Sequence, residues 1–166
     1  MRTLRRRLVA LLFVAAATPA AAHVEFKEKA AAPGEVFRAT LVVGHGCSGS
    51  PTVRLRVRTP AGVVVTKAEP PTGWTVETKI GVYDAPVTIA RRTVSEGVVE
   101  TVWSGRLDPH GHGAFTLDAS VSDDAKAGER IFFPVVQECE KGVLRWIDPS
   151  EDGDSPAPSL LVAPRP

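Results

Sequence analysis

The segment over residues 53–58 alternates strictly between an aliphatic side chain and arginine. A period of two places successive side chains on opposite faces of a strand, so this segment predicts one buried face and three arginines on a solvated face. Residues 36–43 and 63–65 are further apolar segments rich in β-branched residues, and no stretch shows sustained helical periodicity. The sequence therefore predicts an all-β chain.

Six more segments have the composition of short strands, and turn signals separate them. The expected strands cover residues 74–80, 87–93, 98–103, 114–121, 130–136 and 143–147. The turn signals, rich in Pro, Gly, Asp and Ser, lie at residues 32–34, 59–62, 70–73, 84–86, 95–97 and 126–128. Short strands at nearly regular spacing are typical of an antiparallel β-sandwich or barrel.

The first 22 residues have the order of a secretory signal peptide. Four arginines precede a short apolar run over residues 8–17, and Ala20–Ala22 supply the small residues of a cleavage site. The apolar run is too short for a membrane anchor, because a spanning helix needs roughly 20 apolar residues. We expect cleavage between Ala22 and His23 and a periplasmic or extracellular mature protein without a membrane span.

Removal of residues 1–22 would take away four arginines and no acidic residue, which changes the formal charge from +1 to −3. A mildly acidic chain does not support a basic surface for nucleic acid. The rest of the chain suits one domain, which we expect over residues 23–148. Residues 149–166, rich in Pro and Asp, are expected to form a flexible tail.

The chain contains two cysteines, Cys47 and Cys139. In an oxidising compartment an isolated pair most simply forms a disulfide, which would close a loop of about 90 residues. The alternative is a thiolate metal site, but two distant cysteines without CxxC spacing favour it less.

His23 would become the first residue of the processed chain. Its free α-amine and its ring Nδ1 would then form a six-membered chelate, and nitrogen donors in tetragonal geometry suit Cu(II). A histidine can also follow a cleavage site without binding a metal. A second histidine, His45, lies between two glycines and two residues before Cys47, so a disulfide would hold it on a rigid loop. The same bridge would bring Trp146 towards His45.

The chain resembles the YcnI-like copper-binding family. The resemblance rests on His23–Val24, the run HGCSGSPT over residues 45–52, PTGW over 71–74, VWSG over 102–105 and FPVVQECEKGVLRW over 133–146. These motifs occur in order and cover nearly the whole expected mature chain. The long runs carry the specificity.

The resemblance implies an immunoglobulin-like antiparallel β-sandwich that binds Cu(II) in a monohistidine brace. His23 would supply the amine and ring nitrogens, and Trp146 would lie beside the metal. An acidic residue completes the coordination in better-known members, but here His45 stands in its place. Glu25 is a further candidate ligand, since it faces the same side of an extended chain as His23.

The leading hypothesis is therefore an exported Cu(II)-binding protein without catalytic activity, acting in copper acquisition, delivery or tolerance with other envelope copper-handling proteins. The second is a copper oxidoreductase of the histidine-brace type; such enzymes commonly add an axial tyrosine, and Tyr83 is the only tyrosine. The third is a metal-free immunoglobulin-like interaction module.

The two remaining histidines and the two remaining tryptophans have simpler structural interpretations. His110 and His112 would share one face of a strand and form a second metal site, but the flanking Gly and Pro favour a turn. Trp74 and Trp103 are expected in the core or at its rim.

Overall fold

The computed structural model describes residues 23–165, so the predicted signal peptide lies outside the described residues. The described chain forms strands, turns and loops. The strands are β1 (Glu25–Phe26), β2 (Ala30–Ala31), β3 (Val36–Val43), β4 (Thr52–Arg58), β5 (Val63–Glu69), β6 (Thr75–Ile89), β7 (Arg92–Leu107), β8 (Gly113–Val121), β9 (Arg130–Phe132), β10 (Val135–Cys139), β11 (Val143–Trp146) and β12 (Ser159–Val162). No helix in residues 23–165 qualifies as a membrane span.

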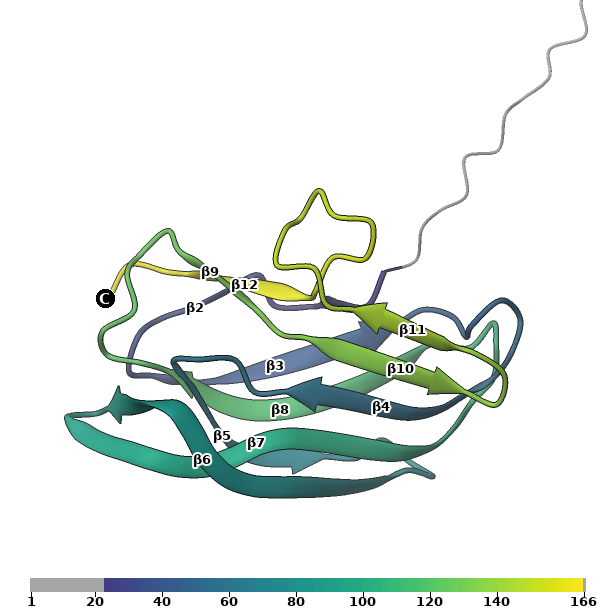
Figure 1. Ribbon diagram of the computed structural model, residues 1–166, viewed down its shortest axis with the longest axis horizontal. Coiled ribbons are helices and arrows are strands. Elements are labelled where there is room, and N and C mark those ends of the chain that lie inside the picture. Colours follow the sequence, from purple (N-terminus) through teal and green to yellow (C-terminus); the bar gives the residue numbers. More distant parts are fainter. Residues whose placement is uncertain (1–22, 166) are drawn as a thin grey trace, which may run out of the picture.

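Two antiparallel sheets make up most of the fold (Figure 1). One has the strand order β1-β3-β8-β5, and the other has the order β11-β10-β4-β7-β6. A third, three-stranded sheet has the order β2-β12-β9, in which β12 runs parallel to β2 and antiparallel to β9. The predicted all-β, immunoglobulin-like sandwich is confirmed.

The alternation of β4 is observed as the sequence predicts. Leu55 and Val57 are buried, whereas the three arginines that alternate with them lie on the outer face of the five-stranded sheet. Arg54 and Arg56 form ion pairs with Glu138 of the neighbouring strand β10. This face is therefore a solvated surface of paired charges.

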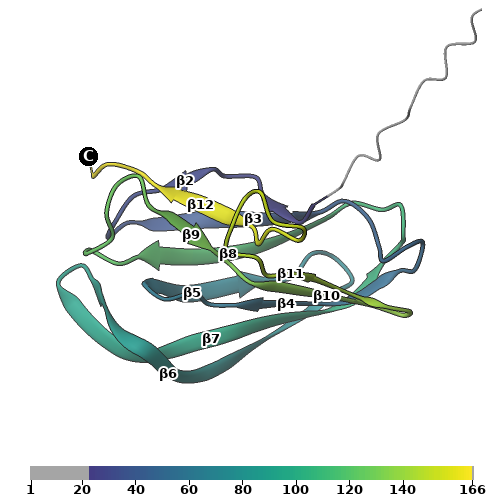
Figure 2. The same cartoon turned by 45° about the horizontal axis from the view of Figure 1, so that its top comes forward.

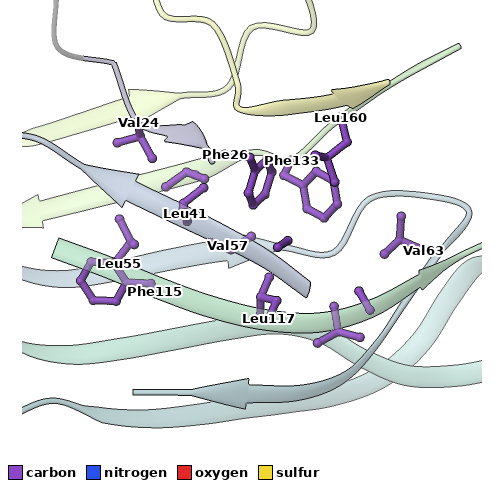
Figure 3. Close-up of a cluster of buried hydrophobic side chains, with 14 of the residues drawn as sticks. Val24, Phe26, Leu41, Leu55, Val57, Val63, Phe115, Leu117, Phe133 and Leu160 are labelled. Atoms are coloured by element: carbon purple, nitrogen blue, oxygen red, sulfur yellow. The ribbon is translucent and has the colours of Figure 1, made fainter. Parts of the chain in front are cut away.

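Apolar side chains from both large sheets fill the space between them (Figure 3). Val24 and Phe26 bring the start of the described chain into this core, and Phe26 packs edge-to-face on Phe133 with ring centroids 4.9 Å apart. Trp103 is fully buried and donates its indole N–H to the carbonyl oxygen of Glu69. Burial of this kind stabilises by roughly 25 cal/mol per Å² of apolar surface.

The β6–β7 hairpin is longer than the sequence predicts. Residues 84–86 and 95–97 carry turn signals, yet the first group lies within β6 and the second within β7. The strand expected over residues 87–93 is interrupted instead, because Ala90 and Arg91 form the turn with φ of 49° and 66°. The signals at 84–86 correspond to a break in the strand register between Val82 and Val87.

The C-terminal segment also differs from the expected flexible tail. The structure contains strand β12 over Ser159–Val162, and Leu160 and Val162 are buried. The chain switches from β9 of the three-stranded sheet to β10 of the five-stranded sheet through Phe133 and Pro134. The packed domain therefore continues through Val162, and the most exposed part of the expected tail is the loop over residues 149–154.

Candidate metal centre

His23 lies immediately before β1, at the start of the described chain. In β1, Glu25 pairs with Val42 and Phe26 with Leu41 of β3. Val24 and Phe26 point into the core, so His23 and Glu25 are left exposed on the other side of the chain. The buried neighbours thus hold His23 at a defined place.

The imidazole of His23 contacts Trp146, the last residue of β11. Their ring centroids are 5.6 Å apart and their planes meet at 73°, an edge-to-face arrangement. β1 and β11 are the terminal strands of the two large sheets, and β11 lies at the edge of its sheet in both views (Figures 1 and 2). The pair therefore sits at one open side of the sandwich.

A buried glutamine connects Trp146 to the loop that carries His45. The indole Nε1–H of Trp146 donates to Oε1 of Gln137, at 3.1 Å. Nε2 of Gln137 donates to the carbonyl oxygen of His45, at 2.7 Å, and to Oγ1 of Thr52, at 2.8 Å. Gln137 is fully buried, so these bonds satisfy polar groups that would otherwise be desolvated without partners. The network fixes Trp146 and the His45 backbone relative to each other.

The predicted disulfide is confirmed. Cys47 and Cys139 are bonded, with Cα atoms 6.0 Å apart, and both are largely buried. Cys47 follows His45 by two residues, and Cys139 follows Gln137 by two residues. The bridge therefore ties the β3–β4 loop to β10 at the same place as the glutamine hydrogen bonds. We call His23, His45, Gln137, Trp146 and this disulfide the histidine rim.

The ring of His45 has one nitrogen in use and one available. Nδ1 lies within hydrogen-bond distance of the carbonyl oxygen of Gly46. A carbonyl oxygen only accepts, so Nδ1 carries the proton and a neutral ring keeps its lone pair on Nε2. A backbone carbonyl often orients a metal-binding histidine in this way.

Carboxylates near His23 are already paired. Glu25 forms an ion pair with Lys29 at 2.8 Å, and both side chains are mostly exposed. Glu28 accepts hydrogen bonds from the backbone N–H and the hydroxyl group of Thr40. Within residues 23–165, no group of three or more His, Cys, Asp or Glu side chains is placed to hold a metal ion. A brace differs from such a group because one residue supplies two of the donors.

A shallow pocket of about 170 Å³ lies beside His23. Its wall includes Arg130 and Glu151, which form an ion pair at 3.1 Å, and residues 156–159 that lead into β12. The C-terminal segment thus contributes to the surroundings of His23, which the sequence alone did not indicate.

His110 and His112 are exposed in the loop between β7 and β8. The backbone N–H of Gly46 donates to the carbonyl oxygen of Pro109 at 2.9 Å, so this loop lies against the loop of His45. The turn predicted around His110 and His112 is confirmed. Tyr83, in contrast, belongs to β6, at the other end of the five-stranded sheet from β11.

The other two tryptophans are structural. Trp103 is in the core, and Trp74 packs edge-to-face on Phe115 with centroids 4.9 Å apart. Gln137 is the site residue that sequence reasoning missed. Its signal was available: it occupies an inward position of the alternating run Val135, Gln137, Cys139, where a polar side chain requires partners.

A family model matches residues 23–162 and is described as a domain of unknown function, DUF1775. The chain belongs to this family, which is the YcnI-like domain family. The matched region begins at His23 and ends at the last residue of β12.

A solved structure of an uncharacterized protein from Nocardia farcinica, described as having an immunoglobulin-like fold, is similar to this chain. The TM-score is 0.64 at 24% identity, and the match covers 85% of this chain and 98% of the other. This similarity supports the fold. Among curated proteins, none matches the chain.

Proposed function

We propose that this protein is exported, is cleaved before His23 and then binds Cu(II) through the α-amine and imidazole of that residue. The observation that carries the proposal is the position of His23, exposed and in edge-to-face contact with Trp146. A residue held there by buried neighbours needs little reordering to bind an ion. Membership of the YcnI-like family supports the same reading.

The donor set of the histidine rim fits Cu(II). In the unprocessed chain the nitrogen of His23 belongs to the peptide bond with Ala22 and cannot serve as an amine donor. After cleavage, the amine and a ring nitrogen of His23 would form a chelate, and nitrogen donors suit Cu(II). We propose Nε2 of His45 as a further donor, and we propose no such role for Glu25, because Lys29 already neutralises its carboxylate.

Trp146 would act as a neighbour of the metal rather than as a ligand. Its indole N–H is held by Gln137, so the ring cannot rotate freely, and its π system lies next to the His23 ring. A fixed aromatic ring shields one side of a bound cation and interacts favourably with its charge. His23 remains exposed, which leaves an approach for an acceptor protein.

These features favour a role in copper acquisition, delivery or tolerance at the cell envelope over oxygenase chemistry. An exposed site suits the exchange of copper with another envelope protein. The axial tyrosine common in brace oxygenases has no counterpart at the histidine rim, since Tyr83 lies on β6.

The test compares the processed protein, beginning at His23, with a version carrying one extra alanine before it. We expect competition titration with Cu(II) to show at least a hundredfold weaker binding by the extended version, because it loses the amine donor. Lys126→Ala in the processed protein, an exposed change in the connection between β8 and β9, is the control and should keep full affinity. Equal affinities of the processed and extended proteins would overturn the proposal.

Two further variants measure how much His45 and Trp146 each contribute to Cu(II) binding. His45→Ala should weaken Cu(II) binding if Nε2 is a donor, whereas Trp146→Phe should change the spectrum of bound Cu(II) more than the affinity. Oxygen consumption with a reductant and candidate polysaccharides separates binder from oxygenase: we expect no turnover above that of free copper.

A further inference from the structure

Strand β6 is a free edge of the five-stranded sheet. It pairs with β7 on one side and is the last strand in the order β11-β10-β4-β7-β6 (Figure 1). Residues Thr75–Val82 are all paired with β7, but the register shifts by one residue of β7 between Lys79 and Ile80 and breaks again after Val82. We call residues 75–82 the β6 edge. Alternate backbone N–H and C=O groups of such an edge have no partner strand and can pair with another extended chain.

The side chains of the β6 edge divide into two faces. Val76, Thr78, Ile80 and Val82 share one face, and Val76 packs against the core. Ile80 is 63% exposed and Val82 is 75% exposed, which places both among the most exposed large apolar side chains of the described chain. Glu77 and Lys79 share the other face.

The charges of the β6 edge form no ion pair within the described chain, although Lys79 stands opposite Glu100 in the register with β7. Neither Glu77 nor Lys79 takes part in an ion pair with any other described residue, whereas Arg54, Arg56 and Arg58 on the same sheet all do. Glu77 and Lys79 are two residues apart on one strand, so their side chains are farther from each other than the side chains of directly opposite residues on paired strands. They can, however, meet their counterparts on a second copy of the same strand.

The pleat restricts how two copies of β6 can pair antiparallel about a twofold axis. At every second residue of an edge strand, the backbone N–H and C=O groups point outward, and in a dimer these residues must lie opposite outward-pointing residues of the other copy. The twofold axis therefore passes through a residue position rather than between two residues. An axis at Glu77 brings two carboxylates together, and an axis at Lys79 brings two ammonium groups together. Both registers place like charges directly opposite and are unfavourable.

An axis at Thr78 gives the opposite result. Glu77 of each copy then faces Lys79 of the other, so two complementary charge pairs form on one face. On the other face, Val76 of each copy meets Ile80 of the other, and Val82 comes opposite Trp74, which precedes the strand. One register therefore matches both the charges and the exposed apolar side chains.

We propose that two copies of this protein associate by antiparallel pairing of their β6 edges, with the twofold axis at Thr78. The pairing joins two five-stranded sheets into one continuous sheet of an isologous dimer. It ends where the strand leaves its register after Val82, and Pro86 beyond it has no backbone N–H to donate. The histidine rim lies at the other end of each sheet and remains open.

Charge reversal tests the proposed register. Sedimentation velocity of the processed, disulfide-bonded, copper-free protein should show monomers converting to dimers as its concentration rises. Glu77→Lys and Lys79→Glu should each weaken dimerisation at least tenfold, because each places like charges opposite one another. The double variant should restore it. Lys126→Glu, an exposed change outside the β6 edge, is the matched control.

Cross-linking locates the axis independently. Under mild oxidation, Thr78→Cys should form a covalent dimer, since only this position faces itself across the axis, whereas Glu77→Cys and Lys79→Cys should cross-link much less. A protein that stays monomeric at all concentrations would overturn the proposal, as would a double charge variant no better than the single ones. Circular dichroism of each variant shows whether it remains folded.

Discussion

The histidine rim and the β6 edge occupy opposite open sides of the same sandwich, and they differ in what the chain leaves unsatisfied. At the rim, Gln137 pairs the buried polar groups and a disulfide fixes the loop, so the available groups are histidine nitrogens. At the β6 edge, the backbone has no second neighbouring strand, two apolar side chains are exposed, and two charges form no ion pair with another described residue. The first arrangement suits a small ion, and the second suits an extended strand.

The largest expected effect concerns the covalent tie of the rim. Replacing Cys47 and Cys139 together with alanine should lower the free energy of unfolding by about 4 kcal/mol, because the bridge closes a loop of 92 residues in the unfolded chain. Denaturant unfolding measures this difference. Dimerisation through the β6 edge should persist while the variant is folded, and a loss below about 1 kcal/mol would contradict the role given to the bridge.

The C-terminal strand is expected to support the side of the molecule that carries His23. Leu160→Ala should cost about 3 kcal/mol, because the fully buried side chain leaves a cavity beside Phe133 and the core. Leu161→Ala is a matched control: Leu161 is 37% exposed and should lose less than about 1 kcal/mol. Equal losses in thermal or denaturant unfolding would show that β12 is not packed as described.

The glutamine network gives a smaller and more specific effect. Gln137→Leu should cost about 2 kcal/mol, because it leaves the buried indole N–H of Trp146 without an acceptor and the carbonyl oxygen of His45 without its donor. In a Trp146→Phe background the same change should cost less, since that indole N–H is already gone. Strict additivity in the double-mutant cycle would argue against the network.

The smallest effect concerns charges that are paired, in contrast with those of the β6 edge. The guanidinium of Arg38 donates a hydrogen bond to Asp118 and holds the pKa of that carboxyl below its ordinary value. A lowered folded-state pKa stabilises the protein above the unfolded value and loses that contribution as pH falls through the folded one. Arg38→Ala should therefore raise the Asp118 pKa towards 3.8, as followed by NMR titration. An unchanged pKa would contradict the pairing.

Much of the sheet structure was predictable because local patterns determine it. Residues 36–43, 53–58 and 114–121 alternate or are β-branched, and they form β3, β4 and β8 with small differences at the ends. The short strands β1, β2 and β12 were missed, since two to four residues carry too little periodicity. The turns predicted at residues 84–86 and 95–97 were wrong, because these residues belong to the long strands β6 and β7.

The residues of the candidate site could be predicted from the sequence, but the hydrogen bonds that link them could not. Cleavage chemistry and cysteine pairing pointed to His23, His45 and Trp146, and the structure places the His23 ring on Trp146. The link from Trp146 to His45 runs through Gln137 and depends on the pairing of β10 with β4 and β11, which is set by tertiary packing. The order of strands that leaves β6 at an edge is likewise a property of the whole fold.

In the proposed site, the amine and the ring of His23 bind Cu(II) together beside Trp146. Electron paramagnetic resonance of the copper-loaded processed protein tests it most directly. We expect a tetragonal Cu(II) spectrum with nitrogen couplings, and a different spectrum once a single alanine precedes His23. Identical spectra from the processed and the extended proteins would contradict it.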